Sequence, residues 1–281
     1  MSFGENPLPP ETLSPLDQER APQAVSATLE ASAEELPWGL WDVVRIAVVA
    51  MIAIGLFSMV AMAIALRGAS NISPADLARN ARVVIPAQFA AYLVVLAFMY
   101  YLVSSKRSHQ DERAAVDPLT AIRWNWPGAS WFGWMALGVA LALLVQSASV
   151  LLPVPKSLPI DRYFRDTVGA YMMAVFGLTF APLVEELFFR GFLYPAVARR
   201  WGMLSGIVVT SALFAFIHAS QLAHAWAPLL LLFFVGVVLT VMRARTGSVA
   251  TTFLIHVGYN ATLFGMLYVA SDHFRHFEKL G

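Results

Sequence analysis

Three short patterns place ionisable and amide side chains inside otherwise apolar sequence. The first is EELFFR, in which Glu185, Glu186 and Arg190 follow eighteen residues whose only ionisable side chain is that of Tyr171. A charged group at the centre of a membrane helix costs roughly 2.5–3.5 kcal/mol on insertion scales. Three such groups within six residues are therefore expected to have either partners or a function.

The spacing of the first pattern separates its two glutamates. Glu186 and Arg190 are four residues apart with the acid first, so they are predicted to lie on one helical face and to neutralise each other. Glu185 points about 100° away around the helix and lacks that partner. A carboxylate left over in an apolar surrounding is suited to general-base catalysis. A structural ion pair near a helix end, with Glu185 facing water, would account for the same residues.

The other two patterns each place two side chains on one helical face. In FAFIH, Phe214 and His218 are four residues apart, and in HVGYN, His256 and Asn260 are four residues apart. Taken alone, either histidine is compatible with ordinary packing, and Asn260 is compatible with a hydrogen bond between helices. Their significance depends on whether these groups meet.

Helix geometry predicts that they do. If the chain turns at Trp201–Gly202, Glu185 and His218 each lie sixteen residues from that turn. At 1.5 Å per residue this corresponds to a depth of roughly 24 Å. Counted from the basic residues before the last apolar run, the HVGYN pattern lies roughly 16 to 22 Å deep on the same side. Four polar side chains from three helices are therefore expected to share one cavity.

The composition indicates that these helices lie in a membrane. Hydrophobic residues make up 58% of the 281 residues and charged residues 13%, whereas soluble domains are nearer a quarter charged. The net charge of +1 argues against a nucleic-acid partner, and the absence of cysteine excludes disulfides and thiolate chemistry. Apolar runs of spanning length recur at 42–66, 83–104, 131–154, 167–189, 203–219, 226–243 and 248–271. The predicted fold is an all-α, polytopic transmembrane helical bundle of about seven to eight spans.

The chain divides into four predicted segments. Residues 1–37 carry six prolines and seven acidic residues against one basic residue, which predicts a disordered tail. Residues 38–163 are predicted N-terminal transmembrane helices, 164–271 the chemically active core, and 272–281 a C-terminal tail. The fourth apolar run is expected to kink or split at Pro182. Basic residues in the loops after the second, fourth and sixth runs predict that these loops share the cytoplasmic side.

Together the three patterns resemble the CAAX-protease and bacteriocin-processing family of membrane proteins. In that family a paired Glu followed by Arg, then Phe-x-x-x-His, then His-x-x-x-Asn occur in this order on successive helices. The matching segments here are Glu185–Arg190, Phe214–His218 and His256–Asn260, and the resemblance covers about residues 164–265. It implies a multi-pass intramembrane endopeptidase, which we expect in a bacterial plasma membrane. Its expected partners are membrane lipid and a peptide or membrane-protein substrate.

The resemblance also implies a role for each motif residue. Glu185 and His218 would activate a water for attack on the scissile carbonyl. His256 and Asn260 would donate hydrogen bonds to the developing oxyanion. The remaining motif residues would orient the site, and they are Glu186, Arg190 and Phe214. No cofactor is expected.

Several alternatives can be weighed from the residues. Neither motif histidine is followed by the Glu of an HExxH zinc protease. A paired-aspartate protease is excluded because no Asp lies in the last four spans. A rhomboid-type serine protease is disfavoured because Ser205 in GMLSG lacks the required spacing. A zinc held by Glu185, His218 and His256 is chemically reasonable, because two histidines and a glutamate are a known ligand set. A proton-relay transporter would use similar residues, but no second half mirrors the first. A non-catalytic membrane scaffold or immunity factor remains open.

Overall fold

The computed structural model describes residues 37–68, 73–106, 117–164 and 166–276, so the predicted N-terminal tail lies outside the described residues except for Pro37. All regular elements in the described ranges are helical, which confirms the predicted fold class. The long helices are α2 (Leu40–Gly68), α4 (Ala81–Ser104), α6 (Trp131–Ser149), α7 (Thr167–Leu178), α8 (Phe180–Glu186), α9 (Tyr194–Ile217), α10 (Trp226–Thr246) and α11 (Val249–Ala270), with a π-helix, η3 (Leu187–Leu193), between α8 and α9. Short helical turns are α3 (Pro74–Leu77), α5 (Pro118–Ala121), η1 (Gly128–Ser130) and η2 (Pro159–Phe164).

Within these ranges, six helical stretches are long and apolar enough to cross a membrane. The longest, 51 residues from Thr167 to Ile217, includes Gly202, whose backbone is non-helical at φ 83° and ψ 163°. The chain reverses at Gly202. The reversal brings residues on either side of it together, since a Cβ on Gly206 would lie 2.8 Å from the Ala198 Cβ. A positive φ is readily adopted only by glycine. When this stretch is counted as two antiparallel arms, the total is the seven predicted passes. The turn between the arms lies at Gly202, as predicted.

The remaining boundaries differ from prediction where prolines act. The fourth pass is split, as Pro182 suggested, but the irregular residue is Thr179 (φ −120°, ψ −75°). Proline disrupts the turn that precedes it, because its ring collides with the carbonyl four residues earlier, while Pro182 itself fits the first turn of α8. The third pass ends at Ser149 and not at residue 154, before Pro153.

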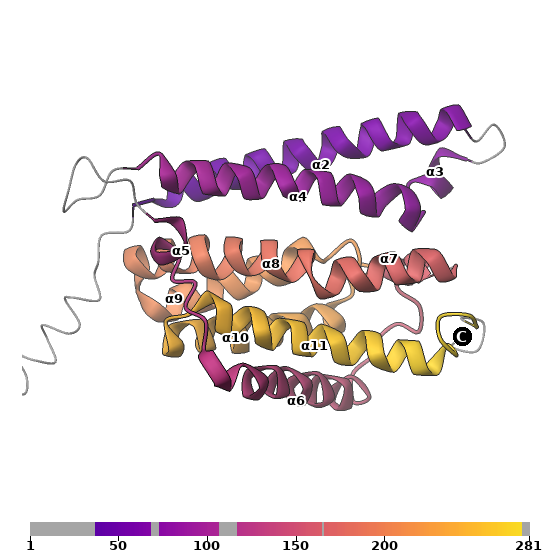
Figure 1. The fold of residues 1–281 in the computed structure, drawn as a ribbon. Coiled ribbons are helices and arrows are strands. Elements are labelled where there is room, and N and C mark those ends of the chain that lie inside the picture. The colour runs from indigo at the N-terminus through magenta and orange to yellow at the C-terminus, as the bar shows by residue number, and fades with distance from the viewer. Residues whose placement is uncertain (1–36, 69–72, 107–116, 165, 277–281) are drawn as a thin grey trace, which may run out of the picture. The chain divides into compact units, whose positions relative to one another are not determined.

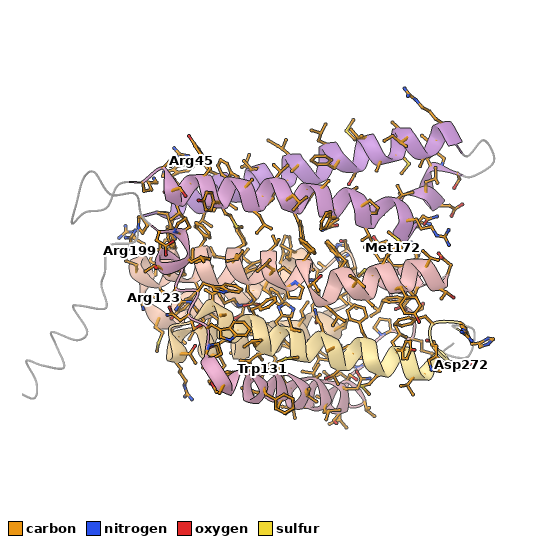
Figure 2. The ribbon with its side chains drawn as sticks, in the orientation of Figure 1. Arg45, Arg123, Trp131, Met172, Arg199 and Asp272 are labelled. Atoms are coloured by element: carbon orange, nitrogen blue, oxygen red, sulfur yellow. The ribbon has the colours of Figure 1, made fainter. Side chains whose placement is uncertain are left out.

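The helices pack in the arrangement drawn in Figure 1. Helices α2 and α4 form a neighbouring pair, α4 contacts α7 and α8, and α6 contacts α11 on the other side of the bundle. Figure 2 places Arg45, Arg123 and Arg199 at one end of the bundle and Asp272 at the other. The described basic loops therefore share one side, as predicted, whereas Arg107 and Arg113 lie outside the described residues.

An ion pair fixes α4 against α7 at the end away from the Gly202 turn. The Arg82 guanidinium lies 2.6 Å from the Asp166 carboxylate, which also accepts a hydrogen bond from the Gly169 amide and so caps α7. The hydrogen bond from Arg82 lowers the pKa of Asp166. Both side chains are substantially exposed, so the contact sets register more than it stabilises the fold.

Two glycines let α6 and α11 approach closely. A Cβ on Gly138 of α6 would overlap the Ile255 carbonyl oxygen, and a Cβ on Gly258 of α11 would overlap that of Met135. Small residues allow such backbone approach in membrane helices. Because α11 carries His256 and Asn260, this contact sets the rotation of the helix that brings them to the centre.

Gly258→Ala is expected to destabilise the protein by about 1–3 kcal/mol, the usual range for an overpacked contact. The added methyl must push α6 from α11, since the atoms that it meets are backbone atoms of Met135. The midpoint of thermal unfolding in detergent measures the effect. Gly265→Ala is the matched control, because Gly265 lies on the same helix and a methyl group added there would have no atom within 4 Å. An equal midpoint for both variants would contradict the packing argument.

Candidate active site

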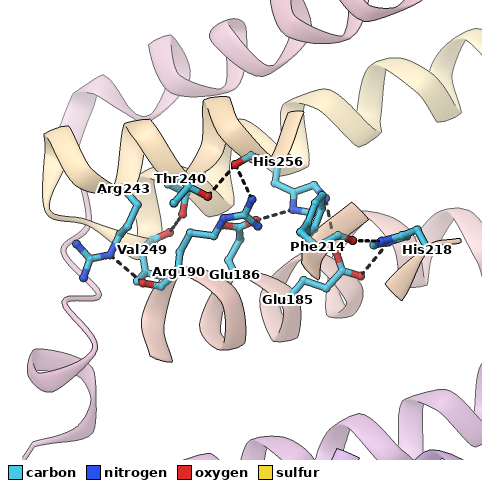
Figure 3. A network of polar contacts seen from close by, with 11 residues as sticks. Glu185, Glu186, Arg190, Phe214, His218, Thr240, Arg243, Val249 and His256 are labelled. Atoms are coloured by element: carbon cyan, nitrogen blue, oxygen red, sulfur yellow. Dashed lines mark hydrogen bonds and ion pairs between the residues drawn. The ribbon is translucent and has the colours of Figure 1, made fainter. Parts of the chain in front are cut away.

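Two of the predicted side chains, His218 and His256, converge on the Glu185 carboxylate. Its Oε1 lies 3.8 Å from His218 Nε2 and its Oε2 lies 3.9 Å from His256 Nε2. Glu185 lies in the last turn of α8, His218 follows the returning arm of α9, and His256 belongs to α11. Figure 3 shows the carboxylate between the two imidazoles. Residues 33 to 71 positions apart therefore meet as the depth argument predicted.

The hydrogen bonds of the two histidines fix which ring nitrogen faces Glu185. His218 Nδ1 lies 2.8 Å from the Phe214 carbonyl oxygen, which can only accept, so this nitrogen carries the hydrogen. His256 Nδ1 lies 2.8 Å from Glu186 Oε1 and likewise donates. In the neutral form of each ring, Nε2 therefore presents a lone pair toward the carboxylate. In the described part of the chain, Glu185 accepts no hydrogen bond within this arrangement.

Behind the first glutamate, Glu186 and Arg190 form the predicted ion pair, and both are fully buried. Arg190 Nη1 lies 2.9 Å from Glu186 Oε1, and Arg190 Nη2 donates to the Gly236 carbonyl at 3.2 Å. The guanidinium also lies 4.5 Å from the centroid of the Phe214 ring. The same Glu186 oxygen holds His256, so the pair neutralises itself and orients one imidazole at the same time.

The π-helix η3 is a feature that the sequence analysis missed. Its looser hydrogen bonding leaves carbonyls free for distant donors: Arg190 O accepts from Arg243 Nε at 3.1 Å, and Phe192 O accepts from the Trp38 indole at 3.2 Å. π-Helical turns inside α-helices are frequent at functional sites. The one signal in the sequence was Pro195, which lacks the amide that would bond to the carbonyl four residues earlier.

Asn260 is oriented by the break between α7 and α8. Its Nδ2 donates to the Gly177 carbonyl oxygen at 2.8 Å. In an uninterrupted helix that oxygen would accept from the amide of residue 181, but the irregular backbone at Thr179 interrupts the ladder. The asparagine therefore satisfies a freed carbonyl with one amide hydrogen and keeps a second one.

All four predicted catalytic residues line one cavity of about 510 Å³. Its other walls are mainly apolar and come from α4, α6, η2, α7, α10 and α11. One wall comes from α4, which supplies Gln88 and Tyr92. No pattern marked them, because one glutamine and one tyrosine in an apolar helix carry no spacing signal. Within the described residues, no group of three or more His, Asp or Glu side chains is arranged to hold a metal ion.

The fold and site define a polytopic helical membrane protein with a polar cluster buried among its last four passes. Residues 167–262, about a third of the chain, match the family model described as type II CAAX prenyl endopeptidase Rce1-like. This match confirms the resemblance indicated by the three motifs, all of which it includes. An "Uncharacterized 24.3 kDa protein" of Escherichia coli is 34% identical over 138 residues, 48% of this chain and 58% of the relative. This chain thus spans little more than half of that relative's length. No solved structure matches this chain.

Glu186→Gln is expected to lower the free energy of unfolding by about 3–5 kcal/mol, because it leaves the buried Arg190 charge without a partner. Equilibrium unfolding in detergent measures the loss. The matched control is the double variant Glu186→Leu with Arg190→Met, in which no buried charge remains and much of the stability should return. A double variant as unstable as Glu186→Gln would show that the ion pair is not what holds this region.

Proposed function

We propose that the protein is an intramembrane endopeptidase that hydrolyses a peptide bond with a water activated by Glu185 and His218. The observation that carries the proposal is the Glu185 carboxylate facing two imidazole Nε2 atoms inside a cavity of a membrane-spanning bundle. The Rce1-like match over residues 167–262 supports the same class of reaction. Membrane lipid surrounds the catalyst, and the substrate is a peptide or a membrane protein.

The geometry suits a water that donates one hydrogen to Glu185 Oε1 and the other to His218 Nε2. As the water oxygen bonds to the scissile carbonyl carbon, Glu185 takes one proton from the water. The π electron pair of the C=O bond moves to the carbonyl oxygen. The tetrahedral intermediate then re-forms the C=O bond and breaks the C–N bond. The leaving nitrogen takes up the proton held by Glu185, which restores the carboxylate.

His256 and Asn260 are proposed to stabilise the oxyanion, and Glu186, Arg190 and Phe214 to orient the site. The hydrogen bond from His256 Nδ1 to Glu186 means that Nε2 can donate only when the ring is protonated. Two glutamates flank this ring, with Glu186 at its Nδ1 and Glu185 at its Nε2. Asn260 has one remaining amide hydrogen for the same purpose.

The family match and the cavity walls support a proposed substrate class. The description of the matching family points to prenylated C-terminal peptides, and an apolar cavity of this kind would also accept an unprenylated apolar segment. We therefore choose two fluorogenic probes, a farnesylated C-terminal peptide and an unprenylated apolar peptide of the same length. A bacterial plasma membrane is the proposed setting, in keeping with the Escherichia coli relative.

Glu185→Gln is expected to lower the turnover of a cleaved probe by about 10²–10⁴-fold, the usual contribution of a general base. The amide has the shape of the carboxylate but cannot accept the proton. Turnover in proteoliposomes measures the effect, with the thermal unfolding midpoint as a check on folding. Asp272→Asn, an exposed residue far from the cavity, is the control. Undiminished turnover of Glu185→Gln would reject the proposed function in favour of a scaffold.

A zinc-dependent version of the reaction would instead use Glu185, His218 and His256 as ligands. If the water is activated by the side chains alone, prolonged dialysis against a chelator should leave turnover unchanged. The control is a zinc protease treated in the same buffer, which must lose its activity. Loss of turnover that returns on adding zinc would establish the metal-dependent alternative.

A further inference from the structure

The two motif residues proposed to donate to the oxyanion are each partly committed to other acceptors. His256 commits its Nδ1 hydrogen to Glu186, and Asn260 commits one of its two amide hydrogens to the Gly177 carbonyl. An intermediate with a developing oxyanion is stabilised chiefly by preorganised donors in such a site. An additional donor is therefore expected on a neighbouring wall, and α4 supplies one.

Tyr92 on α4 lines the same cavity as Glu185. Its hydroxyl oxygen accepts a hydrogen bond from Gln88 Nε2 at 3.1 Å, and its ring lies 5.4 Å from the Phe176 ring. Among the described residues, the Tyr92 hydroxyl donates to no acceptor. Gln88 and Phe176 thus hold the phenol in place while its hydrogen stays available to an occupant of the cavity.

The register of the helices puts Tyr92 at the depth of Glu185. Helices α4 and α7–α8 run in the same direction (Figure 1), and Phe89 packs edge-on against Phe180 with centroids 4.5 Å apart. From that contact Tyr92 lies three residues further along α4 and Glu185 five residues further along α8. At 1.5 Å per residue their depths differ by about 3 Å.

We infer that Tyr92 is a further catalytic residue, whose O–H group donates a hydrogen bond to the carbonyl oxygen of the scissile bond as it becomes an oxyanion. The inference rests on the proposed peptidase function. The phenol keeps its proton throughout, so Glu185 and His218 still handle the protons of the water. The N-terminal helices then contribute a reacting group and are more than a support for the motif-bearing helices.

Tyr92→Phe tests this inference because it removes only the hydroxyl. With the fluorogenic probe that the parent protein cleaves, kcat should fall on the order of 10²–10³-fold, the usual loss for one oxyanion donor. KM should change little, because the interaction strengthens only in the transition state. Tyr100→Phe is the matched control: Tyr100 lies on the same helix, is 65% exposed and does not line the cavity, so the kcat of this variant should stay near the parent value.

The outcomes separate the two proposals. Parent-like kcat for Tyr92→Phe, together with loss of turnover in Glu185→Gln, would overturn the role of Tyr92 and leave the peptidase standing. A rise in KM alone would also overturn it, since that would make Tyr92 a binding contact. If the parent cleaves neither probe, the proposed function fails and this inference with it. An unchanged unfolding midpoint of Tyr92→Phe shows that any loss of kcat does not arise from misfolding.

Discussion

The structure depends on one constraint, which is that charge buried in a membrane bundle must be paired. Glu186 and Arg190 are both fully buried, and each is held by groups from other helices: His256 of α11, Gly236 of α10 and the ring of Phe214 of α9. A carboxylate or guanidinium left alone there would be far more costly than the pair. Satisfying this pair therefore forces three helices to meet around η3, and the other site residues follow from that meeting.

Much of this arrangement was predictable because it is periodic. The separation of the two glutamates follows from 100° per residue, and the pairing with Arg190 follows from the four-residue spacing. The meeting of Glu185 with His218 follows from equal distances to the turn, and Gly202 does adopt the reversing backbone there. The passes were recognisable from apolar runs, since length and composition alone determine what can span a bilayer.

The features that escaped prediction involve unpatterned residues or backbone irregularity. Nothing in LFFRGFL distinguishes a π-helix from an α-helix, because the donors that bond to its carbonyls, Trp38 and Arg243, lie far away along the chain. The break fell at Thr179 and not at Pro182 because a proline acts on the turn before it. Tyr92 carried no signal either, since its proximity to the site arises from how α4 packs against α8.

The two adjacent glutamates divide the work because a helix sends neighbouring side chains in different directions. Glu186 turns toward Arg190 and His256, which both contact its Oε1, so this carboxylate is committed to the ion pair and does not line the cavity. Glu185 turns into the cavity, where in the described structure two histidine nitrogens are its only ionic contacts. A low dielectric strengthens every remaining interaction of that carboxylate. One helix turn thus supplies both an anchored charge that shapes the site and an unanchored one that can accept a proton.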